Sequence, residues 1–391
     1  MASFSPHILI LRLHRLEHIP SALACTELIK ENGTQIELYE FGNSLHFRFF
    51  RKGLRAPCVF FNTLLHLTIR FLFSAKPSLI MSHGLQEQCL ALWLNLFFGI
   101  PYVCHVHEIF ESSELTFWNR TFFFFEGMAL RKARATFFPD SNREDIYRKR
   151  YLLKQKGNIL FNCPRLRNPP QRNIDLRKRY NLSPDSVLLT YVGGIGPANL
   201  LEETLCAVAP IPNVFLFILG WADEHFLFQL KDLIRNLHML NRVIFIDGVN
   251  LKWEYLENSD IALSLYRPNT LRRKYVATAS NKLMEGLAAG IPVIVSNEPD
   301  FKNIVEGLSV GICSELSIDS IQKVVQFLVN NPSERRRLGE NGYRAHNDLF
   351  HYEMQLSKFW HGLNQVNAIQ AIDARAYYSQ TIRDLKPHFN P

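Results

Sequence analysis

Short continuous apolar runs alternate along the chain with longer stretches in which apolar residues recur at every third or fourth position. The short runs are typical of strands buried on both faces of a parallel sheet, and the longer period is typical of amphipathic helices. In the first part of the chain the runs predict strands at residues 7–13, 35–39, 79–82, 102–105, 135–139 and 159–164. The longer period predicts helices at residues 21–30, 58–73, 87–98, 122–131 and 142–150.

A stiff, basic stretch with three prolines, at residues 162–170, interrupts this alternation and is typical of a connection between domains. The same alternation then begins again. It predicts strands at residues 187–192, 214–219, 243–246, 261–266, 292–296 and 311–313. The helices expected in this part are residues 201–209, 226–237, 253–258, 281–290, 317–330, 333–347 and 350–363.

Strands that alternate with helices in this way predict an α/β protein with two Rossmann-like, doubly wound domains that face a cleft. The first domain is expected at residues 1–166 and would bind the acceptor of any group transfer. The second is expected at residues 167–348. Residues 349–391 are expected to form a C-terminal helix and tail that pack back on the first domain.

Length and composition agree with a globular protein of about two domains, with 391 residues, 47% of them hydrophobic and 20% charged. The formal net charge is 44 minus 36, or +8, and much of the excess lies at residues 148–156 and 165–179. Such an excess suits nucleic acid, an anionic membrane surface or a phosphorylated substrate, although a solvated basic surface explains any single cluster equally well.

The seven scattered cysteines include no CxxC pair, which indicates free thiols in a reducing compartment. The first apolar run is broken by Arg12, His14 and Arg15 before a signal-peptide core could form. The two most apolar stretches, residues 58–73 and 89–104, are too short and too interrupted to span a bilayer. These features predict a cytoplasmic protein and leave open a peripheral position on the inner membrane face.

Residues 280–296 combine a loop end, an amphipathic helix, a Gly-Ile-Pro stop and a buried strand. Ser280 or Asn281 can cap the helix, whose free backbone N–H groups suit an anion such as a diphosphate. Lys282 adds a full positive charge, and Glu285 lies one turn further, where a carboxylate can accept hydrogen bonds from ribose hydroxyls. The alternative is an ordinary helix with a solvated lysine and glutamate.

Other candidates follow predicted strands, because ligands of such sheets bind beyond the carboxyl ends of the strands. In the first domain they are residues 82–84 and 105–108, and in the second domain they include residues 193–196, Gly220 and residues 247–248. His105, His107 and Glu108 do not have the HExxH spacing of zinc enzymes, so no metal is predicted. A histidine after a buried strand can equally be structural.

Several common site motifs are missing from the sequence. The glycines at residues 193–196 do not form the GxGxxG dinucleotide fingerprint, and there is no Walker-type phosphate loop. No Gly-x-Ser-x-Gly elbow is present either, which argues against a serine hydrolase.

Taken together, these features resemble the retaining glycosyltransferases of the two-Rossmann (GT-B) architecture, particularly the family 4 group (glycosyl transferases group 1). The resemblance covers roughly residues 75–363. It is carried by residues 102–108, ILFNCP at 159–164, the Gly-bearing strand ends at 192–194 and 219–220, Asp-Gly-Val at 247–249, and above all SNKLMEGLAAGIPVIVS at 280–296.

The resemblance implies a nucleotide-diphosphate sugar as the donor and no cofactor. It implies that Asn281 and Leu283 offer backbone N–H groups to the diphosphate, that Glu285 holds the ribose, and that His107 faces the transferred sugar. The remaining residues that we assign to the donor site are Gly194, Gly220, Ser280 and Lys282. His107 and Lys282 are the candidate catalytic residues.

The sequence also departs from the family pattern. Where many members have a first glutamate, eight positions before Glu285, this chain has Ala277, and Arg272, Arg273 and Lys274 precede it as candidate phosphate or sugar contacts. The family's arginine in the loop after the first strand of the second domain is also missing, because that loop here is residues 196–199, Gly-Pro-Ala-Asn.

We therefore expect a glycosyltransferase that moves a sugar, with retention of configuration, to a glycan or lipid-linked acceptor at the cell surface. Two alternatives share the architecture. A catalytically silent nucleotide-sugar-binding module would fit the departures, and a non-hydrolysing nucleotide-sugar epimerase would need more cleft carboxylates than Glu108 and Glu285. Nucleic acid is not an expected partner, and binding to it would show a strong salt dependence.

Overall fold

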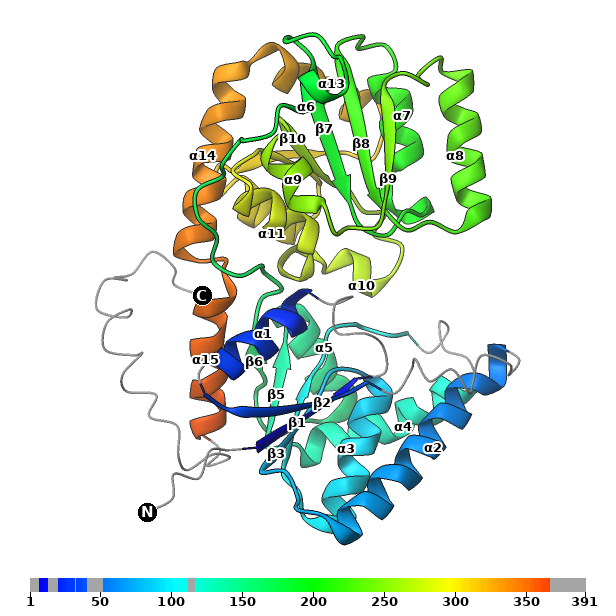
Figure 1. Ribbon diagram of the computed structural model, residues 1–391, viewed down its shortest axis with the longest axis vertical. Coiled ribbons are helices and arrows are strands. Elements are labelled where there is room, and N and C mark those ends of the chain that lie inside the picture. The colour runs from blue at the N-terminus through cyan, green and yellow to red at the C-terminus, as the bar shows by residue number, and fades with distance from the viewer. Residues whose placement is uncertain (1–6, 13–19, 32, 41–51, 112–116, 366–391) are drawn as a thin grey trace. The chain divides into compact units, whose positions relative to one another are not determined.

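The computed structural model of the chain describes residues 7–12, 20–31, 33–40, 52–111 and 117–365, and these divide into two units (Figure 1). The first unit is discontinuous in sequence and comprises Met1–Phe161 and Tyr352–Pro391. The second unit is Asn162–His351. The first unit therefore ends a few residues before position 166, and the chain returns to it after His351.

The first unit is built on a parallel six-stranded sheet in the order β2-β1-β3-β4-β5-β6. Its strands are β1 (His7–Arg12), β2 (Gln35–Glu40), β3 (Leu79–Ser82), β4 (Tyr102–His105), β5 (Ala135–Phe138) and β6 (Asn158–Ile159). Its helices are α1 (Pro20–Glu31), α2 (Lys52–Phe73), α3 (Leu85–Phe98), α4 (Phe117–Lys132), α5 (Ser141–Tyr151) and α15 (Tyr352–Gln365).

The strand order explains how these helices cover the sheet. From β2 onward the chain moves in one direction across the sheet, so right-handed crossovers place α2, α3, α4 and α5 on one face. The step from β1 to β2 runs the other way and places α1 on the opposite face, where α15 packs against α1, β5 and β6. There the ring of Phe359 lies 4.9 Å from the ring of Phe137.

The second unit has a parallel six-stranded sheet in the order β12-β11-β10-β7-β8-β9. Its strands are β7 (Val187–Val192), β8 (Val214–Gly220), β9 (Val243–Asp247), β10 (Ile261–Ser264), β11 (Val293–Ser296) and β12 (Gly311–Ser314). Its helices are α6 (Leu176–Arg179), η4 (Pro197–Asn199), α7 (Leu201–Val208), α8 (Glu224–Asn236), α9 (Lys252–Glu257), α10 (Leu271–Lys274), η5 (Ala277–Ala279), α11 (Asn281–Ala288), α12 (Pro299–Val305), α13 (Ile318–Asn330) and α14 (Pro332–Asp348). Every residue of the central strand β7 is buried, as expected for a parallel sheet covered on both faces.

The predicted α/β class with two doubly wound sheets is confirmed. The short helices α6, α10 and α12 were not predicted, because four to seven residues are too few to show a clear helical period. The helix predicted at residues 350–363 begins at Tyr352. Among the described helices, none has an apolar segment long enough to cross a membrane.

Candidate functional site

The carboxyl end of the second sheet gathers the loop after β7, the end of β8 and the start of α11. Ser280 caps α11, and its hydroxyl accepts a hydrogen bond from the Leu283 N–H at 3.2 Å. The same hydroxyl lies 3.0 Å from those of Ser264 and Tyr266, which fix its position. Of the two candidate caps, Ser280 or Asn281, it is therefore Ser280 that forms the N-cap.

The cap decides which backbone donors remain available to a ligand. The Leu283 N–H is used by Ser280, so it is not free for a diphosphate in this structure, in contrast to the expectation from the sequence. The backbone N–H groups of Asn281 and Lys282 donate to no acceptor among the described residues. Anion binding at this helix start would therefore use Asn281 and Lys282 rather than Asn281 and Leu283.

The ammonium group of Lys282 is held beside the glycine loop of β7. Its Nζ donates to the hydroxyl of Tyr266 at 3.1 Å and to the side-chain oxygen of Asn199 at 3.4 Å. It also lies 5.1 Å from the ring centre of Tyr191. Burial opposes the charge, but the neighbouring oxygens of Tyr191 and Tyr266 hold the pKa of Lys282 above its ordinary value. The group is therefore a fixed positive charge at neutral pH.

Asn199 occupies the loop in which the resembling family has an arginine. Its side-chain amide donates to the carbonyl of Gly194 at 2.9 Å, and its oxygen accepts from Lys282. Asn199 thus supplies no charge of its own but ties Lys282 to the glycine loop. This pairing was not predicted, because Asn199 and Lys282 are 83 residues apart in the sequence.

Gly220 has a packing role at the end of β8. With φ of +152°, it adopts a conformation that suits glycine, and a Cβ at this position would lie 1.8 Å from the carbonyl oxygen of Gly193. A Cβ at Gly194 would meet no atom within 4 Å. Gly220 therefore lets the two strand ends lie together, and Gly194 leaves open space beside the loop.

Glu285 is buried, and its carboxylate accepts a hydrogen bond from the ammonium group of Lys252 at 2.5 Å. Lys252 begins α9, shortly after the Asp247-Gly248 strand end. This pair was not predicted, because its members are 33 residues apart in the sequence. Any ribose bound by Glu285 would meet a carboxylate whose position is already fixed by Lys252.

The basic loop forms the short helix α10, and η5 connects it to Ser280. Arg273 donates to the side chain of Asn269 at 2.7 Å, and the Lys274 ammonium lies 5.6 Å from the ring centre of Tyr275. Ala277, which stands where the family glutamate would be, is buried in η5. An Ala277 side chain offers no polar contact to a sugar.

In the first unit, His107 belongs to a cluster of three buried histidines at the carboxyl ends of β3 and β4. His83 Nδ1 lies 3.0 Å from His107 Nε2, and the rings of His105 and His107 are 4.0 Å apart. Four ring nitrogens have no hydrogen-bond partner among the described residues: His83 Nε2, both of His105 and His107 Nδ1. The sequence placed these residues at neighbouring strand ends but did not show that they touch.

The three imidazoles are neutral at neutral pH. Burial lowers the pKa of His105 to about 3, with the nearby Arg12 guanidinium contributing. Burial, followed by the positive charges of its neighbours, also holds the pKa of His107 and of His83 well below the ordinary value. His107 therefore offers a neutral ring nitrogen for a hydrogen bond and does not act as a strong acid.

The ring nitrogens of the three histidines lie within 4.8 Å of one another, which is close enough for them to share a metal ion. Neutral imidazoles are the form that zinc requires. Two observations work against a cation: the His83 and His107 nitrogens already lie at hydrogen-bonding distance, and the Arg12 charge that lowers the histidine pKa values would also repel a metal. The expectation of a metal-free protein stays a prediction.

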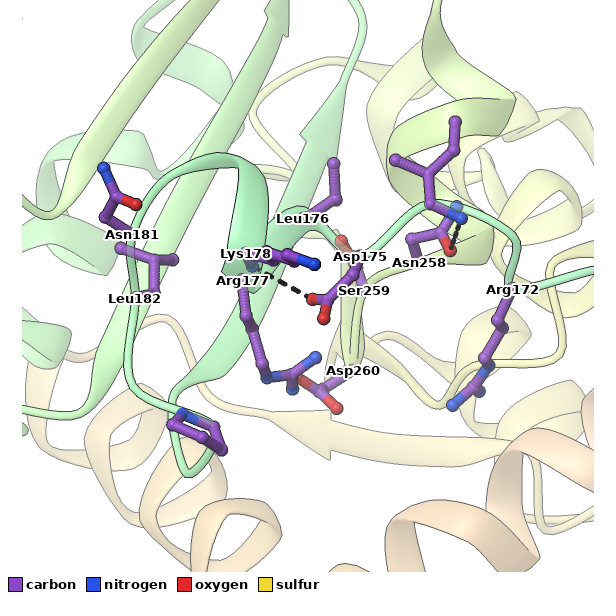
Figure 2. Close-up of a pocket in the computed structure, with 12 residues that line it drawn as sticks. Arg172, Asp175, Leu176, Arg177, Lys178, Asn181, Leu182, Asn258, Ser259 and Asp260 are labelled. Atoms are coloured by element: carbon purple, nitrogen blue, oxygen red, sulfur yellow. Dashed lines mark hydrogen bonds and ion pairs between the residues drawn. The ribbon is translucent and has the colours of Figure 1, made fainter.

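A hollow of about 710 Å³ opens at the opposite end of the second sheet from the proposed donor site, where the strands β7 and β10 begin (Figure 2). It is lined by Asp175, Arg177 and Lys178 on one side and Ser259 and Asp260 on the other. Arg177 forms an ion pair with Asp260, whose carboxylate also accepts from the backbone of Leu188. Because these charges hold the connecting segment on the sheet, we assign this hollow a structural role.

A comparison with protein families finds one match, which covers much of the second unit. The profile of the family described as "Glycosyl transferases group 1" matches residues 173–345, which lie within the second unit. No curated protein sequence gives a significant match.

The fold is similar to that of several solved structures. Sucrose-phosphate synthase from Thermosynechococcus elongatus has 16% identity and a TM-score of 0.73, with 93% of this chain and 99% of that chain covered. Anabaena HepE in complex with UDP and glucose has 12% identity and a TM-score of 0.70, with coverages of 92% and 100%. WaaG, a glycosyltransferase involved in lipopolysaccharide biosynthesis, has 13% identity and a TM-score of 0.68, with coverages of 93% and 100%. The chain therefore has the two-sheet α/β fold of GT-B glycosyltransferase structures, and its second unit is similar to group 1 glycosyl transferases.

Proposed function

We propose that this protein is a cytoplasmic retaining glycosyltransferase that takes a sugar from a nucleotide-diphosphate donor, without a metal ion, to a glycan or lipid-linked acceptor. One observation carries the proposal: the fixed charge of Lys282 and the unused N–H groups of Asn281 and Lys282 meet at the start of α11, inside the region that matches group 1 glycosyl transferases. The scattered cysteines, four of which are buried, agree with a reducing compartment.

The donor would bind with its diphosphate at the start of α11. The helix N-terminus and the Lys282 ammonium group both favour negative charge there, and Arg272 to Lys274 add positive charge in the preceding helix. The ribose would contact the carboxylate of Glu285, which Lys252 holds in place. The open space beside Gly194 would let the donor approach the backbone closely.

Transfer would then depend mainly on positioning and on stabilising the leaving diphosphate. As the bond from the sugar to the phosphate breaks, negative charge grows on the phosphate oxygen beside Lys282. His107 would orient the transferred sugar by hydrogen-bonding one of its hydroxyls through a neutral ring nitrogen, and because Nδ1 is buried in this structure the contact requires a shift of the ring. In a front-face reaction the acceptor hydroxyl attacks on the side from which the nucleotide leaves and gives its proton to the leaving phosphate oxygen, so the new bond from the sugar to the acceptor retains the configuration.

A donor screen tests this proposal. Release of nucleotide diphosphate is measured for a panel of nucleotide sugars, beginning with UDP-sugars because similar structures were solved with UDP. The Lys282→Met variant should lower turnover by about 10² to 10³-fold while binding of the bare nucleoside changes little. The exposed Lys323 on α13 gives the matched control, Lys323→Met. An equal loss of nucleoside affinity in Lys282→Met would contradict the phosphate role.

A silent nucleotide-sugar-binding module is the second candidate. It is favoured by Ala277 in place of the family glutamate and by the uncharged Asn199 in place of the arginine. Tight binding of nucleotide sugars without release or transfer, for every donor and acceptor tried, would favour the module over the enzyme.

A further inference from the structure

Helix α2 exposes a continuous row of large apolar side chains. Phe61, Leu65, Ile69 and Leu72 recur at steps of four, four and three residues, so they lie along one side of the helix, and all four are exposed. Phe73 ends the row and is 86% exposed. A row of large apolar side chains exposed to solvent is unusual, because an amphipathic helix of a folded unit normally packs its apolar side against the core.

The neighbouring helices extend this surface. Helix α3 packs against both α2 and α4, so the three helices form one layer on the first sheet (Figure 1). Leu96 and Phe97 at the end of α3 are exposed, as are Phe124 and Phe125 on α4. We call these nine residues the α2–α4 face: Phe61, Leu65, Ile69, Leu72, Phe73, Leu96, Phe97, Phe124 and Phe125.

Charge on this layer has one sign. The three helices contain only two acidic residues, Glu87 and Glu126, and both are buried. In the described parts of the three helices and of the turns that follow them, every exposed charged side chain is basic, namely Lys76, Arg120, Arg131, Lys132 and Arg134. A surface that combines exposed aromatic and aliphatic side chains with unopposed basic groups is complementary to an anionic lipid surface.

The topology brings the apolar and basic groups to one edge. Helices α2, α3 and α4 each lead directly into the next strand of a parallel sheet, so their last turns all lie at the edge where the strands begin. This edge therefore carries Phe73, Phe97 and Lys132. It is the edge opposite the histidine cluster, which follows the carboxyl ends of β3 and β4.

We propose that the α2–α4 face docks on the surface of a membrane rich in anionic phospholipid, with its apolar side chains in the interface and its basic groups at the headgroups. The protein then lies on the bilayer, since no described helix could cross it. A second copy of the chain fits less well, because a two-fold contact through this face would bring the two sets of basic groups together. The proposal goes beyond sugar transfer and does not depend on it.

The test is co-sedimentation of the whole protein, without donor or acceptor, with vesicles of phosphatidylcholine alone or with phosphatidylglycerol. We expect binding to the anionic vesicles that weakens with salt. Leu65→Ser/Ile69→Ser/Phe73→Ser should lower the partition coefficient at least about tenfold, and Lys132→Glu/Arg134→Glu should lower it by a similar factor on anionic vesicles only. The matched control is Phe228→Ser/Leu240→Ser, which removes equally exposed apolar groups from the second unit.

Melting temperature, oligomeric state and nucleotide affinity are measured on the same variants. If the triple serine variant melts at a clearly lower temperature, the face is covered by the chain itself, and the proposal is wrong. A dimer that the variant converts to a monomer, with no vesicle binding by the wild type, would assign the face to a second copy and also overturn it. Unchanged nucleotide affinity in every variant is expected, so membrane docking and sugar transfer can fail separately.

Discussion

At the scale of single residues, the donor site depends on pairs that hold each charged group in one place. Lys282 is held by Tyr266 and Asn199, and Glu285 by Lys252. Fixed groups of this kind favour a reaction that depends on positioning, because they need little rearrangement when charge develops. They also mean that removing one partner changes the other.

Glu285 gives a prediction at this scale. Replacing it with alanine would leave Lys252 without its partner, so Glu285→Gln is the cleaner change, since the amide oxygen still accepts a hydrogen bond. We expect Glu285→Gln to weaken nucleotide diphosphate binding about tenfold, because a neutral amide accepts ribose hydroxyls less strongly. Calorimetric titration checks this, with the exposed Glu306→Gln as the control. Equal affinities for Glu285→Gln and the wild type would remove the ribose role.

At the scale of elements, neighbouring strands and helices create buried environments that shift proton equilibria in opposite directions. The ends of β3 and β4 bury three neutral histidines, while α4 buries the carboxyl group of Glu126 against the Tyr151 hydroxyl at 2.5 Å. Both environments link the folding free energy to pH, and the two signs differ.

The histidine cluster should make the first unit sensitive to acid. The folded pKa of His105, about 3, lies below its ordinary value of 6.5, so the unfolded chain binds more protons between these values. This contribution to stability is complete above pH 6.5 and is lost, by about 1.4 kcal/mol per pH unit, as the pH falls toward 3. His105→Gln should therefore show a shallower fall of unfolding free energy with acid. The exposed His66→Gln serves as control, and identical slopes for His105→Gln and the wild type would contradict the prediction.

Glu126 should have the opposite effect. Burial raises its pKa from 4.5 to about 7, so the folded protein binds an extra proton between these values, and stability is lost as the pH rises through that range. Glu126→Gln keeps an acceptor for Tyr151 but carries no charge, and we expect it to raise the unfolding free energy by roughly 2–3 kcal/mol at pH 8. Denaturant unfolding at pH 8 and pH 4 checks this, because the difference between the two proteins should shrink at pH 4. A gain of the same size at both pH values would show that burial of charge is not the cause.

At the scale of the whole molecule, the chain makes two folded units from three segments, because α15 returns to the first unit. In α15, the side chain of Gln355 accepts a hydrogen bond from the Phe161 N–H at 3.2 Å. Phe161 is the residue before the start of the second unit. The first unit therefore cannot be completed until α15 has formed.

Phe359 tests this arrangement. It is fully buried against Phe137, so Phe359→Ala should destabilise the first unit by about 3–5 kcal/mol. The second unit contains the proposed donor site, and its nucleotide affinity should stay unchanged. Calorimetric unfolding with and without UDP measures both, with the exposed Phe327→Ala on α13 as the control. Loss of nucleotide affinity in step with loss of stability would mean that the two units do not fold independently.

The sequence by itself determined the longer strands and helices and their order, because neighbouring residues carry the strand and helix periods, whereas the short helices α6, α10 and α12 carry too few residues to show one. It also determined the start of α11, since Ser280 acts on an N–H group three positions away. Tertiary structure alone decided which distant residues meet. Lys252 pairs with Glu285 and His83 touches His107 only because of the order in which the strands lie in each sheet, and hydrophobic periodicity carries no record of that order.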